Sequence, residues 1–303
     1  MTSQSVLVSS PLLIVSGPAS PMLARRVADA MKTNVLQLEH KVFPDGETYI
    51  RFPEPVDGER VAVVQSCYPP QNKNLIDLLF ILDAAREMGA REVAAVVPYF
   101  AYARQDDRYR SGEAVSAKTS ARLIEAAGAS HFLTIDVPSN KALQFFRIHS
   151  ENLTCMNLMG TYLKTRALEK PYVLAPDDGA IPLAQTVSTV LQSEYAWFEK
   201  SRDKVTGAVS TSGKDVDLRG RDAVIVDDVI STGKTIANTA QIAKKQGSRR
   251  VIAACAHLLL TGNAEQTLKV AGVEETIGTD SIEIRPQSVS IAPVLAEALR
   301  RIW

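Results

Sequence analysis

The sequence predicts an α/β protein made of two similar parts, each an open and mostly parallel sheet flanked by helices. Short β-branched apolar runs alternate with longer amphipathic stretches along the chain, as expected where parallel strands are joined by helical crossovers. Several helix-like stretches end at a glycine, including Gly89 and Gly247, a residue typical of helix C-termini. Similar segments lead from these two glycines into a strand, Gly-Ala-Arg-Glu-Val and Gly-Ser-Arg-Arg-Val. They are either an internal repeat or two ordinary helix-to-strand junctions.

The first half of the chain is expected to alternate strands with helices. Short runs rich in aliphatic residues suit strands that are buried on both faces, and they lie at Leu12–Val15, Val61–Gln65, Val93–Val97 and Phe132–Ile135. Longer amphipathic stretches suit helices that cover a sheet, and they lie at Met22–Lys32, Leu75–Met88 and Ser116–Ala127.

The second half repeats this alternation. Strands are expected at Tyr172–Ala175, Val224–Val226 and Val251–Ala254, and helices at Ile181–Leu191, Thr235–Gln246 and Asn263–Val270. A last helix, Ile291–Ile302, is expected to return and cover the first half. We therefore predict an N-terminal domain over residues 1–153, a C-terminal domain over 154–290 and a terminal helix over 291–303.

The composition argues against several functional classes. The 303 residues are 46% hydrophobic and 22% charged, which is ordinary for a chain of two globular domains. With 34 Lys and Arg against 34 Asp and Glu, and with 6% aromatic residues, a dedicated nucleic-acid binder is not expected. No apolar run reaches the length of about 18 residues that a membrane span needs. The three cysteines are widely spaced and form no disulfide or zinc pattern, so we expect a cytoplasmic protein.

The strongest chemical signal lies at residues 223–235, Ala-Val-Ile-Val-Asp-Asp-Val-Ile-Ser-Thr-Gly-Lys-Thr. An apolar strand is expected to end at Asp227 and Asp228, and a turn rich in hydroxyl groups and glycine then opens a helix. Backbone N–H groups at a helix N-terminus favour an anion such as phosphate, and Gly233 allows close approach of that anion. The two carboxylates repel phosphate, so they suit sugar hydroxyls or a divalent metal.

Two other interpretations of this segment are weaker. Its end, Thr232 to Thr235, is similar to the end of an ATPase P-loop. That motif needs a glycine five positions before Gly233, where this chain has Asp228. The hydroxyl residues also fit an ordinary helix cap, but a cap alone does not explain two adjacent acids.

The segment resembles the ribose-phosphate loop of the type I phosphoribosyltransferase fold, and four further segments narrow the resemblance. They are Phe-Pro-Asp-Gly-Glu-Thr at 43–48, Pro-Tyr-Phe-Ala-Tyr-Ala-Arg-Gln-Asp at 98–106, Gly-Glu-Ala-Val-Ser-Ala-Lys at 112–118 and Ala-Pro-Val-Leu-Ala-Glu-Ala at 292–298. Together they resemble the ribose-phosphate pyrophosphokinase (phosphoribosyl pyrophosphate synthetase) family over essentially the whole chain. Arg-Tyr-Arg at 108–110 and Ser-Thr-Gly at 231–233 look closest to archaeal members.

The resemblance implies an enzyme, a transferase of diphosphate groups, with two domains of type I phosphoribosyltransferase fold. Members transfer the pyrophosphoryl group of ATP to the C1 hydroxyl of ribose 5-phosphate, giving 5-phosphoribosyl 1-pyrophosphate and AMP. ATP is then a co-substrate and Mg²⁺ the expected metal, with Mn²⁺ as an alternative. The family's ATP site lies between subunits, so a homo-oligomer is also expected, with no nucleic-acid or membrane partner.

The resemblance assigns roles to residues in five segments. Lys200 and Arg202 match the catalytic loop, whose cations offset the charge of the transferring group. Ribose 5-phosphate is expected to contact Arg202, Asp227, Asp228, Ser231, Thr232, Gly233, Lys234 and Thr235. The pyrophosphate loop matches Asp177, Asp178 and Gly179, of which Asp177 is expected to bind the metal. The ATP site matches Arg104 and Gln105 together with Phe43, Asp45, Gly46 and Glu47. Outside this context, segments 43–48 and 177–179 also fit tight turns, and Arg104 also fits an exposed loop position.

Two positions depart from the family pattern. Pro138 stands where the family carries a histidine that serves the ATP-bound metal, and Ala180 stands where it has a second glycine. Asp136 and Asn140 are alternative oxygen donors near Pro138. The departures favour one alternative, a catalytically weak regulatory homologue that binds nucleotides. Another alternative, a phosphoribosyltransferase that consumes the activated sugar, does not account for the Arg-Gln pair of the first half.

Overall fold

The chain forms two compact units. The computed structural model describes residues 12–202, 209–213, 216–285 and 289–303, and at 199–202 and 209–213 it describes the backbone alone. The first unit comprises residues up to Thr134, Ser139–Asn152 and Leu295–Trp303, whereas the second comprises Ile135–Pro138 and Leu153–Val294. The domain bounds expected from the sequence, 1–153, 154–290 and 291–303, concern parts of the chain that fold independently, and they remain a prediction.

The first unit is built on a six-stranded sheet with the strand order β2-β1-β5-β6-β7-β8. Its strands are β1 (Leu12–Ser16), β2 (Val35–Gln37), β5 (Arg60–Val64), β6 (Glu92–Val96), β7 (His131–Ile135) and β8 (His149–Leu153). Its connecting helices are α1 (Pro21–Met31), α2 (Gln71–Glu87) and α3 (Ser116–Ala126). The strand pairs from β2 to β7 are all parallel. The expected open parallel sheet is confirmed for this unit.

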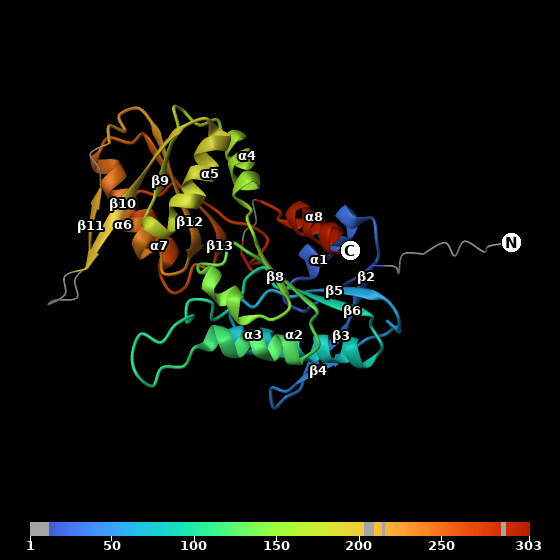
Figure 1. Cartoon of the computed structure of the whole chain (residues 1–303). Coiled ribbons are helices and arrows are strands. Elements are labelled where there is room, and N and C mark those ends of the chain that lie inside the picture. Colours follow the sequence, from blue (N-terminus) through green and yellow to red (C-terminus); the bar gives the residue numbers. More distant parts are fainter. Residues whose placement is uncertain (1–11, 203–208, 214–215, 286–288) are drawn as a thin grey trace. The chain divides into compact units, whose positions relative to one another are not determined.

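The strand order puts helices on both faces of this sheet. The chain moves from β1 through α1 to β2 toward one edge, and from β5 through α2, β6 and α3 to β7 toward the other. Right-handed crossovers in opposite directions place α1 on one face and α2 with α3 on the other, as Figure 1 shows. Because both faces are covered, β5 and β6 each bury four of their five residues, which explains their continuous apolar runs.

A separate two-stranded hairpin carries the 43–48 segment. It consists of β3 (Glu39–Val42) and β4 (Thr48–Arg51), which pair antiparallel from Glu39 with Arg51 to Val42 with Thr48. These strands were not predicted from the sequence, because every residue of β3 is exposed and no buried face imposes an apolar pattern on it.

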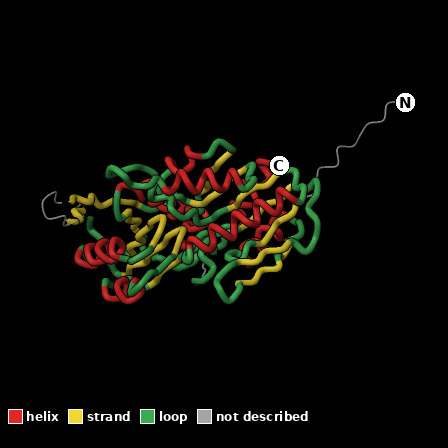
Figure 2. Tube along the Cα trace, turned by 90° about the horizontal axis from the view of Figure 1, so that it is seen from below, coloured by secondary structure: helices red, strands yellow, loops and turns green. Residues whose placement is uncertain are grey.

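The second unit is built on a sheet with the order β11-β10-β9-β12-β13-β14. Its strands are β9 (Tyr172–Ala175), β10 (Glu194–Arg202), β11 (Val209–Gly213), β12 (Asp222–Ile230), β13 (Arg250–Leu258) and β14 (Glu275–Ile277). Its helices are α4 (Met156–Lys164), α5 (Ile181–Leu191), α6 (Lys234–Lys245) and α7 (Ala264–Val270). Only the β10–β11 pair is antiparallel among the pairs described. Figure 2 shows the strands and helices of the chain in separate colours.

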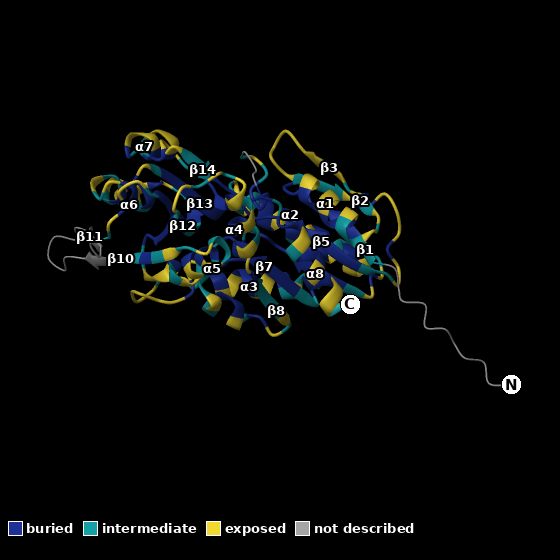
Figure 3. Ribbon diagram, turned by 90° about the horizontal axis from the view of Figure 1, so that it is seen from above, coloured by how far each residue is buried: buried dark blue, intermediate teal, exposed yellow. Residues whose placement is uncertain are grey.

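In the second sheet too, the direction in which successive strands are added reverses, here between β9 and β12. The chain moves from β9 through α5 to β10 toward one edge, and from β12 through α6, β13 and α7 to β14 toward the other. The neighbouring strands β12 and β13 are almost wholly buried, while exposed residues gather on α6 and α7 (Figure 3). Open parallel sheets bind their ligands beyond the carboxyl ends of the strands at such a reversal, or switch point.

The last helix, α8 (Ala292–Ile302), ends within the first unit. Arg301 pairs with Glu151 at 2.6 Å, and the Trp303 indole N–H donates to Glu92. These polar contacts fix the end of the chain to strands β6 and β8.

The fold class predicted from the sequence is confirmed, although several elements were not predicted. The elements not predicted are β2, β3, β4, β8, α4, β10, β11 and β14. Within the described residues, no helix has both the length and the apolar character needed to cross a lipid bilayer.

Candidate active site

Three carboxylates lie at the switch point of the second sheet. Asp177 lies two residues after Ala175, the last residue of β9, and Asp227 and Asp228 lie in the neighbouring strand β12. Burial raises the pKa of Asp227 well above its usual range, and the charges of Asp228 and Asp177 raise it further. The residues predicted to contact sugar and metal therefore gather at the edge where an open parallel sheet binds ligands.

The end of β12 differs from the prediction. The apolar strand Val224–Val226 was expected to end at the two acids that follow it, but it continues to Ile230. The reason is its neighbour β13, which supplies partners for the added residues, including Cys255 opposite Asp227 and His257 opposite Val229. The two acids therefore belong to a strand in a sheet, and their backbone is fixed by that pairing rather than by a loop.

The loop after β12 leads directly into helix α6. Gly233 occupies the N-cap with φ of 74°, and α6 begins at Lys234. The Ser231 carbonyl accepts a hydrogen bond from the Thr261 backbone N–H at 3.0 Å, and the hydroxyl groups of these two residues are 3.2 Å apart. Thr232 and Lys234 are exposed. A helix N-terminus with exposed hydroxyl and ammonium groups suits a phosphate monoester.

Thr261 was not predicted as part of this loop. It follows β13 and lies thirty residues after Ser231, so no local motif links the two. The only signal for it in the sequence is its place after a strand, because the carboxyl ends of parallel strands share one edge of a sheet.

The predicted pyrophosphate loop forms a tight 3₁₀ turn. The Asp177 carboxylate accepts a hydrogen bond from the Gly179 backbone N–H at 3.1 Å and so caps the turn Asp178–Ala180. Asp178 and Gly179 are exposed, whereas Ala180 is buried. The methyl group of Ala180 therefore points into the protein, and the exposed backbone of the turn stays accessible to an anion.

The carboxylates of the switch point fit a hard divalent cation. Their mutual repulsion adds to the effect of burial in raising the pKa of Asp227, and a bound cation would relieve that repulsion. Among the side chains that the structure describes, no three or more His, Cys, Asp or Glu groups are arranged to enclose a metal ion by themselves. This donor set suits Mg²⁺, which usually keeps waters and binds through one or two carboxylates plus substrate phosphates.

Pro138 lies between two residues with side-chain oxygen donors, Asp136 and Asn140. Pro138 and Asn140 are exposed, and Asn140 accepts a hydrogen bond from the Asn152 amide at 2.9 Å. Asp136 is buried, and its carboxylate accepts a hydrogen bond from the Cys155 backbone N–H at 2.9 Å. Burial raises the pKa of Asp136, and the charge of Asp228 adds to this effect. Asp136 therefore lies near the carboxylates of the switch point.

Lys200 and Arg202 lie on the antiparallel pair at the edge of the second sheet. Backbone pairing sets Lys200 opposite Thr211 and Arg202 opposite Val209. Their side chains lie outside the described residues, and so do residues 203–208 of the predicted loop. The catalytic role of both residues stays a prediction.

The switch point of the first sheet is filled by its own side chains. Gln65 and Ser20 are fully buried. The Gln65 side chain accepts a hydrogen bond from the Ala19 N–H at 3.0 Å and donates one to the Asn74 carbonyl at 3.2 Å. Ser20 Oγ accepts a hydrogen bond from the Ser66 N–H at 2.9 Å. Since these polar groups satisfy each other, the second unit offers the better ligand site.

Arg104 and Gln105 lie on the loop between β6 and α3. Both are exposed, and the Gln105 side chain accepts a hydrogen bond from the Ser116 hydroxyl at 2.6 Å. The Arg104 guanidinium has no hydrogen-bond or ion-pair partner among the described residues. The adjacent Asp106 is buried and accepts a hydrogen bond from the Tyr109 hydroxyl at 3.1 Å. The loop is therefore held by internal hydrogen bonds, and Arg104 is exposed on it.

The 43–48 segment forms the tip of the β3–β4 hairpin. The Phe43 N–H donates to the Glu47 carbonyl at 2.8 Å, and the Gly46 N–H donates to the Phe43 carbonyl at 2.9 Å. The Asp45 carboxylate accepts a hydrogen bond from the Glu47 N–H at 3.2 Å, and Gly46 has φ of 96°. The tip is thus a tight turn, and Phe43 stays 42% exposed, with its ring beside Tyr49 and the Lys41 ammonium group.

A pocket of about 460 Å³ lies beside this tip. It is lined by Gly46, Glu47, Thr48, Asn72, Lys73, Ile76 and Phe80. Two residues predicted for the ATP site therefore border a cavity, together with apolar side chains of α2.

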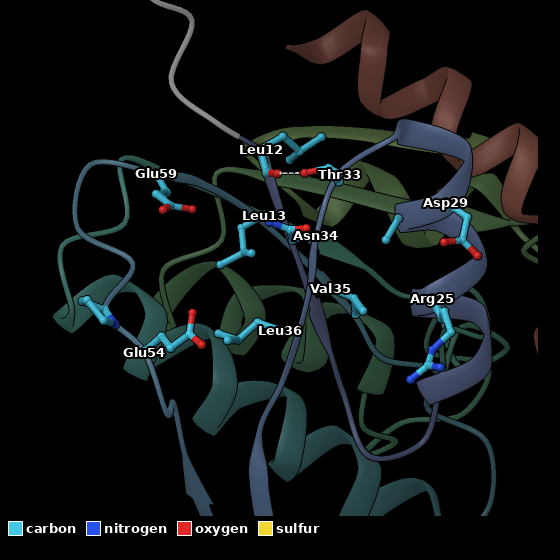
Figure 4. A pocket seen from close by; sticks show the side chains of 12 residues that line it. Leu12, Leu13, Arg25, Asp29, Thr33, Asn34, Val35, Leu36, Glu54 and Glu59 are labelled. Atoms are coloured by element: carbon cyan, nitrogen blue, oxygen red, sulfur yellow. Dashed lines mark hydrogen bonds between the residues drawn. The ribbon is translucent and has the colours of Figure 1, made fainter.

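A larger pocket of about 610 Å³ lies elsewhere in the first unit (Figure 4). It includes Leu12 and Leu13 at the start of β1, with Arg25 and Asp29 of α1 on one side and Glu54 on another. It is formed at the amino end of a strand and contains none of the predicted site residues. We therefore do not assign the reaction to it.

Comparison with known proteins agrees with this geometry. Residues 12–128 match the family described as the N-terminal domain of ribose phosphate pyrophosphokinase, and residues 143–290 match the phosphoribosyl transferase domain. The ribose-phosphate pyrophosphokinase of Methanothermobacter thermautotrophicus is 41% identical over 288 residues, covering 95% of this chain and 100% of the relative. That of Methanosarcina mazei is 40% identical over 289 residues, covering 95% of each chain.

A solved structure shares the whole architecture. The crystal structure of phosphoribosylpyrophosphate synthetase from Mycobacterium smegmatis superposes with a TM-score of 0.85 at 29% identity, covering 97% of this chain and 99% of the other. The likeness to archaeal relatives expected from the sequence is confirmed by these matches.

Proposed function

The chain belongs to the ribose-phosphate pyrophosphokinase family, and from this membership we infer what each of its candidate site residues does in the reaction. The protein is an enzyme that transfers the pyrophosphoryl group of ATP to the C1 hydroxyl of ribose 5-phosphate, giving 5-phosphoribosyl 1-pyrophosphate and AMP. The C1 oxygen forms a bond to the β-phosphorus, and the hydroxyl loses its proton. The bond from that phosphorus to the oxygen bridging to the α-phosphorus breaks, and AMP leaves with that oxygen.

Positioning and charge neutralisation dominate such a reaction. Both reactants are anions and AMP leaves as an anion, so correctly placed cations and hydrogen-bond donors matter more than a strong base. The candidate residues supply groups of these kinds, and we divide them into four sets.

The sugar-phosphate set lies at the switch point of the second sheet. Ser231 to Thr235 hold the 5-phosphate through the N-terminus of α6, and Asp227 and Asp228 accept hydrogen bonds from the ribose hydroxyls. The observation that carries this assignment is the electrostatic contact of Asp227 with Asp228 and Asp177 beside that helix N-terminus. An acidic pair next to an anion site matches a ligand that has hydroxyl groups at one end and phosphate at the other.

The pyrophosphate set is the turn at Asp177, Asp178 and Gly179. The exposed backbone of the turn faces the transferred group, and Asp177 contributes an oxygen to Mg²⁺. When bound, Mg²⁺ neutralises phosphate charge. The carboxylates of the switch point suit this ion in their chemistry, and ATP oxygens and water complete its ligands.

The third set neutralises the charge that develops during transfer. Lys200 and Arg202 supply it, and Arg202 also contacts ribose 5-phosphate. Support comes from the family match, which includes both positions. A guanidinium group suits phosphate oxygens because it donates two parallel hydrogen bonds.

The fourth set binds ATP and is shared between subunits. Arg104 and Gln105 contribute from one chain, and the hairpin residues Phe43, Asp45, Gly46 and Glu47 contribute from its neighbour in a homo-oligomer. The exposed Phe43 ring and the Arg104 guanidinium, which has no partner within the described part of the chain, support this assignment, because each suits the face of a purine.

The direct test of the activity is ³¹P NMR of purified protein mixed with ATP, Mg²⁺ and ribose 5-phosphate. We expect AMP and 5-phosphoribosyl 1-pyrophosphate in equal amounts from the wild-type protein, and formation about 10²–10³-fold slower from Lys200→Ala. ATP binding without turnover in Mg²⁺ or Mn²⁺ would instead favour the regulatory homologue, an interpretation the comparisons do not support. In that case Pro138→His is the next variant to make.

Mixing two inactive variants tests the shared ATP site. Arg104→Ala and Phe43→Ala remove groups from opposite sides of the proposed site, so a mixed pair contains one site with both defects and one intact site. Randomly mixed pairs should recover about a quarter of the wild-type activity. No recovery, with subunit exchange verified by mass spectrometry, would place both residues in the site of a single chain.

A further inference from the structure

The peptide group that joins Ile135 to Asp136 is held at both of its polar atoms. The Ile135 carbonyl accepts a hydrogen bond from Nε2 of His257 at 2.9 Å. The N–H of the same peptide, that of Asp136, donates to the Leu153 carbonyl at 2.8 Å. All four residues belong to the second unit. The orientation of this peptide plane is therefore fixed by two anchors.

Asp136 needs such anchoring because its backbone is strained. Its φ is +36°, a left-handed conformation that L residues other than glycine adopt at a cost. Strained residues of this kind persist where surrounding structure enforces them, and they concentrate at functional sites. Asp136 is 5% exposed, and the charge of Asp228 acts on its carboxylate. The orientation of the preceding peptide, together with the hydrogen bond from the Cys155 N–H at 2.9 Å, thus sets where this carboxylate lies near the sugar-binding pair.

His257 is itself fixed in one tautomer. The side chain is 1% exposed, and its Nδ1 lies 2.9 Å from the Ser281 hydroxyl oxygen. A carbonyl oxygen only accepts hydrogen bonds, so Nε2 must carry the proton that the Ile135 carbonyl receives. A neutral ring then accepts the Ser281 hydroxyl proton at Nδ1.

The hydroxyl groups of Thr279 and Ser281 are placed so that they can serve this neutral tautomer. The Thr279 and Ser281 hydroxyl groups both have the Ala256 carbonyl within reach, at 2.7 and 2.9 Å, and their oxygens are 2.9 Å apart. When Thr279 donates to this carbonyl, the Ser281 proton is available to Nδ1 of His257. The Ser281 backbone N–H donates to the Thr279 oxygen at 3.1 Å. A buried imidazolium would add an unneeded charge to a site that is already satisfied.

We propose that His257 is a positioning residue of the active site: its Nε2–H fixes the Ile135–Asp136 peptide and thereby holds the Asp136 carboxylate beside Asp228 for ribose 5-phosphate binding. The inference rests on the role proposed above for Asp228. His257 acts through Asp136 and need not touch the substrate. It lies on β13 opposite Val229, so the same strand that extends β12 also supplies the anchor.

Two substitutions of His257 by amide residues distinguish a role in positioning the Ile135–Asp136 peptide from a role in packing alone. In His257→Gln, the amide nitrogen lies near the place of Nε2 and keeps the bond to the Ile135 carbonyl. In His257→Asn, the shorter amide lies near the place of Nδ1 and loses that bond. Both variants replace the same buried ring by an amide, so a packing role alone affects both.

Steady-state kinetics gives the first readout. We expect His257→Asn to raise the KM for ribose 5-phosphate about tenfold, with the KM for ATP within about twofold of the wild-type value. His257→Gln should stay within about twofold for both substrates. Equal losses in the two variants, or equal changes in the two KM values, would overturn the positioning role.

NMR of ¹⁵N-histidine-labelled protein gives a readout independent of activity. The chain has four histidines, and the signal that disappears in His257→Gln identifies His257. We expect Nε2 protonated and Nδ1 unprotonated, whereas the opposite tautomer would exclude donation to Ile135 and overturn the proposal. The variant Asp228→Asn separates the two proposals: an unchanged KM for ribose 5-phosphate in that variant contradicts the role of Asp228, while the tautomer still tests the His257 anchor.

Discussion

Asp177 and Asp227 interact across the switch point of the second sheet, where burial raises the pKa of Asp227 and the charges of Asp228 and of Asp177, which follows the neighbouring strand, raise it further. Fifty residues separate them along the chain. Before ligands bind, this edge of the sheet holds carboxylates that repel one another, so the site lowers the stability of the free protein. Sites that store repulsion in this way favour the binding of cations and hydrogen-bond donors.

Replacing Asp227 should stabilise the free protein while it damages activity. A carboxyl whose pKa is raised in the folded state contributes stability below its unfolded pKa of about 3.9, and this is lost as pH rises through the folded pKa. Asp227→Asn should therefore melt at a higher temperature than the wild type at pH 7 to 8 but not near pH 4. Its kcat/KM for ribose 5-phosphate should fall by at least about tenfold. Scanning fluorimetry across pH measures the first effect.

Asp217 provides the control for that experiment. Hydrogen bonds from Arg219 lower the pKa of the exposed Asp217 carboxyl to about 2. The contribution of Asp217 to stability depends on pH in the opposite direction from that of Asp227. A carboxyl with a lowered pKa contributes stability above its unfolded pKa, and this stability is lost as pH falls. Asp217→Asn should give no increase in melting temperature at pH 7, and an increase equal to that of Asp227→Asn would contradict the argument.

Replacing Gly233 by alanine should weaken sugar-phosphate binding in addition to lowering the stability of the protein. Its φ is +74°, and a Cβ atom there would lie 3.1 Å from Cγ of Leu268. Gly220 has a similar φ of +68° with no atom within 4 Å of such a Cβ. Alanine at either position should cost about 1–2 kcal/mol of folding free energy. Only Gly233→Ala should weaken binding of ribose 5-phosphate in calorimetry, and equal weakening by Gly220→Ala would remove the special role of Gly233.

Lys200 and Arg202 should affect turnover more than binding. Groups that offset charge developing in the transition state contribute about 10²–10³-fold to kcat when removed singly. Lys200→Ala and Arg202→Ala should therefore lower kcat by about that factor with little change in the KM for ATP. Lys245, exposed in the last turn of α6, is the matched control. A loss of kcat in Lys245→Ala would indicate a general effect of net charge.

Asp222 should be a stability residue without a catalytic role. It is fully buried at the start of β12, where it accepts hydrogen bonds from Arg249 Nε at 2.9 Å, Arg249 Nη2 at 2.7 Å and the Glu169 N–H at 2.9 Å. Asp222→Asn removes the charge from this pair and should cost about 2–3 kcal/mol. Urea unfolding measures this loss, and kcat at low temperature should not change.

Glu169 is the control for Asp222, because it faces the same arginine from the surface. Its carboxylate lies 3.4 Å from Arg249 and is 66% exposed. Exposed ion pairs contribute little, so Glu169→Gln should change the free energy of unfolding by less than about 0.5 kcal/mol. A loss as large as that of Asp222→Asn would show that burial does not decide the difference.

Local sequence patterns predicted most of the buried strands and the helices that pack on them. The helix expected at Ile181–Leu191 has those bounds in the structure, because apolar spacing and capping residues act within one or two turns. The hairpin strands β3 and β4 were missed, since exposed strands impose no apolar alternation. The length of β12 was missed as well, because the partner residues that extend it lie on β13.

The sequence by itself determined the fold class, the family and the residue types that the chemistry needs, because side-chain chemistry and short-range backbone preference are written in neighbouring residues. Only the tertiary structure decided which of them meet. Asp177 approaches Asp227 because β9 and β12 pair at the point where the sheet reverses. His257 reaches the Ile135 carbonyl across 122 residues. Such contacts depend on strand order and on packing between distant segments, which no local pattern specifies.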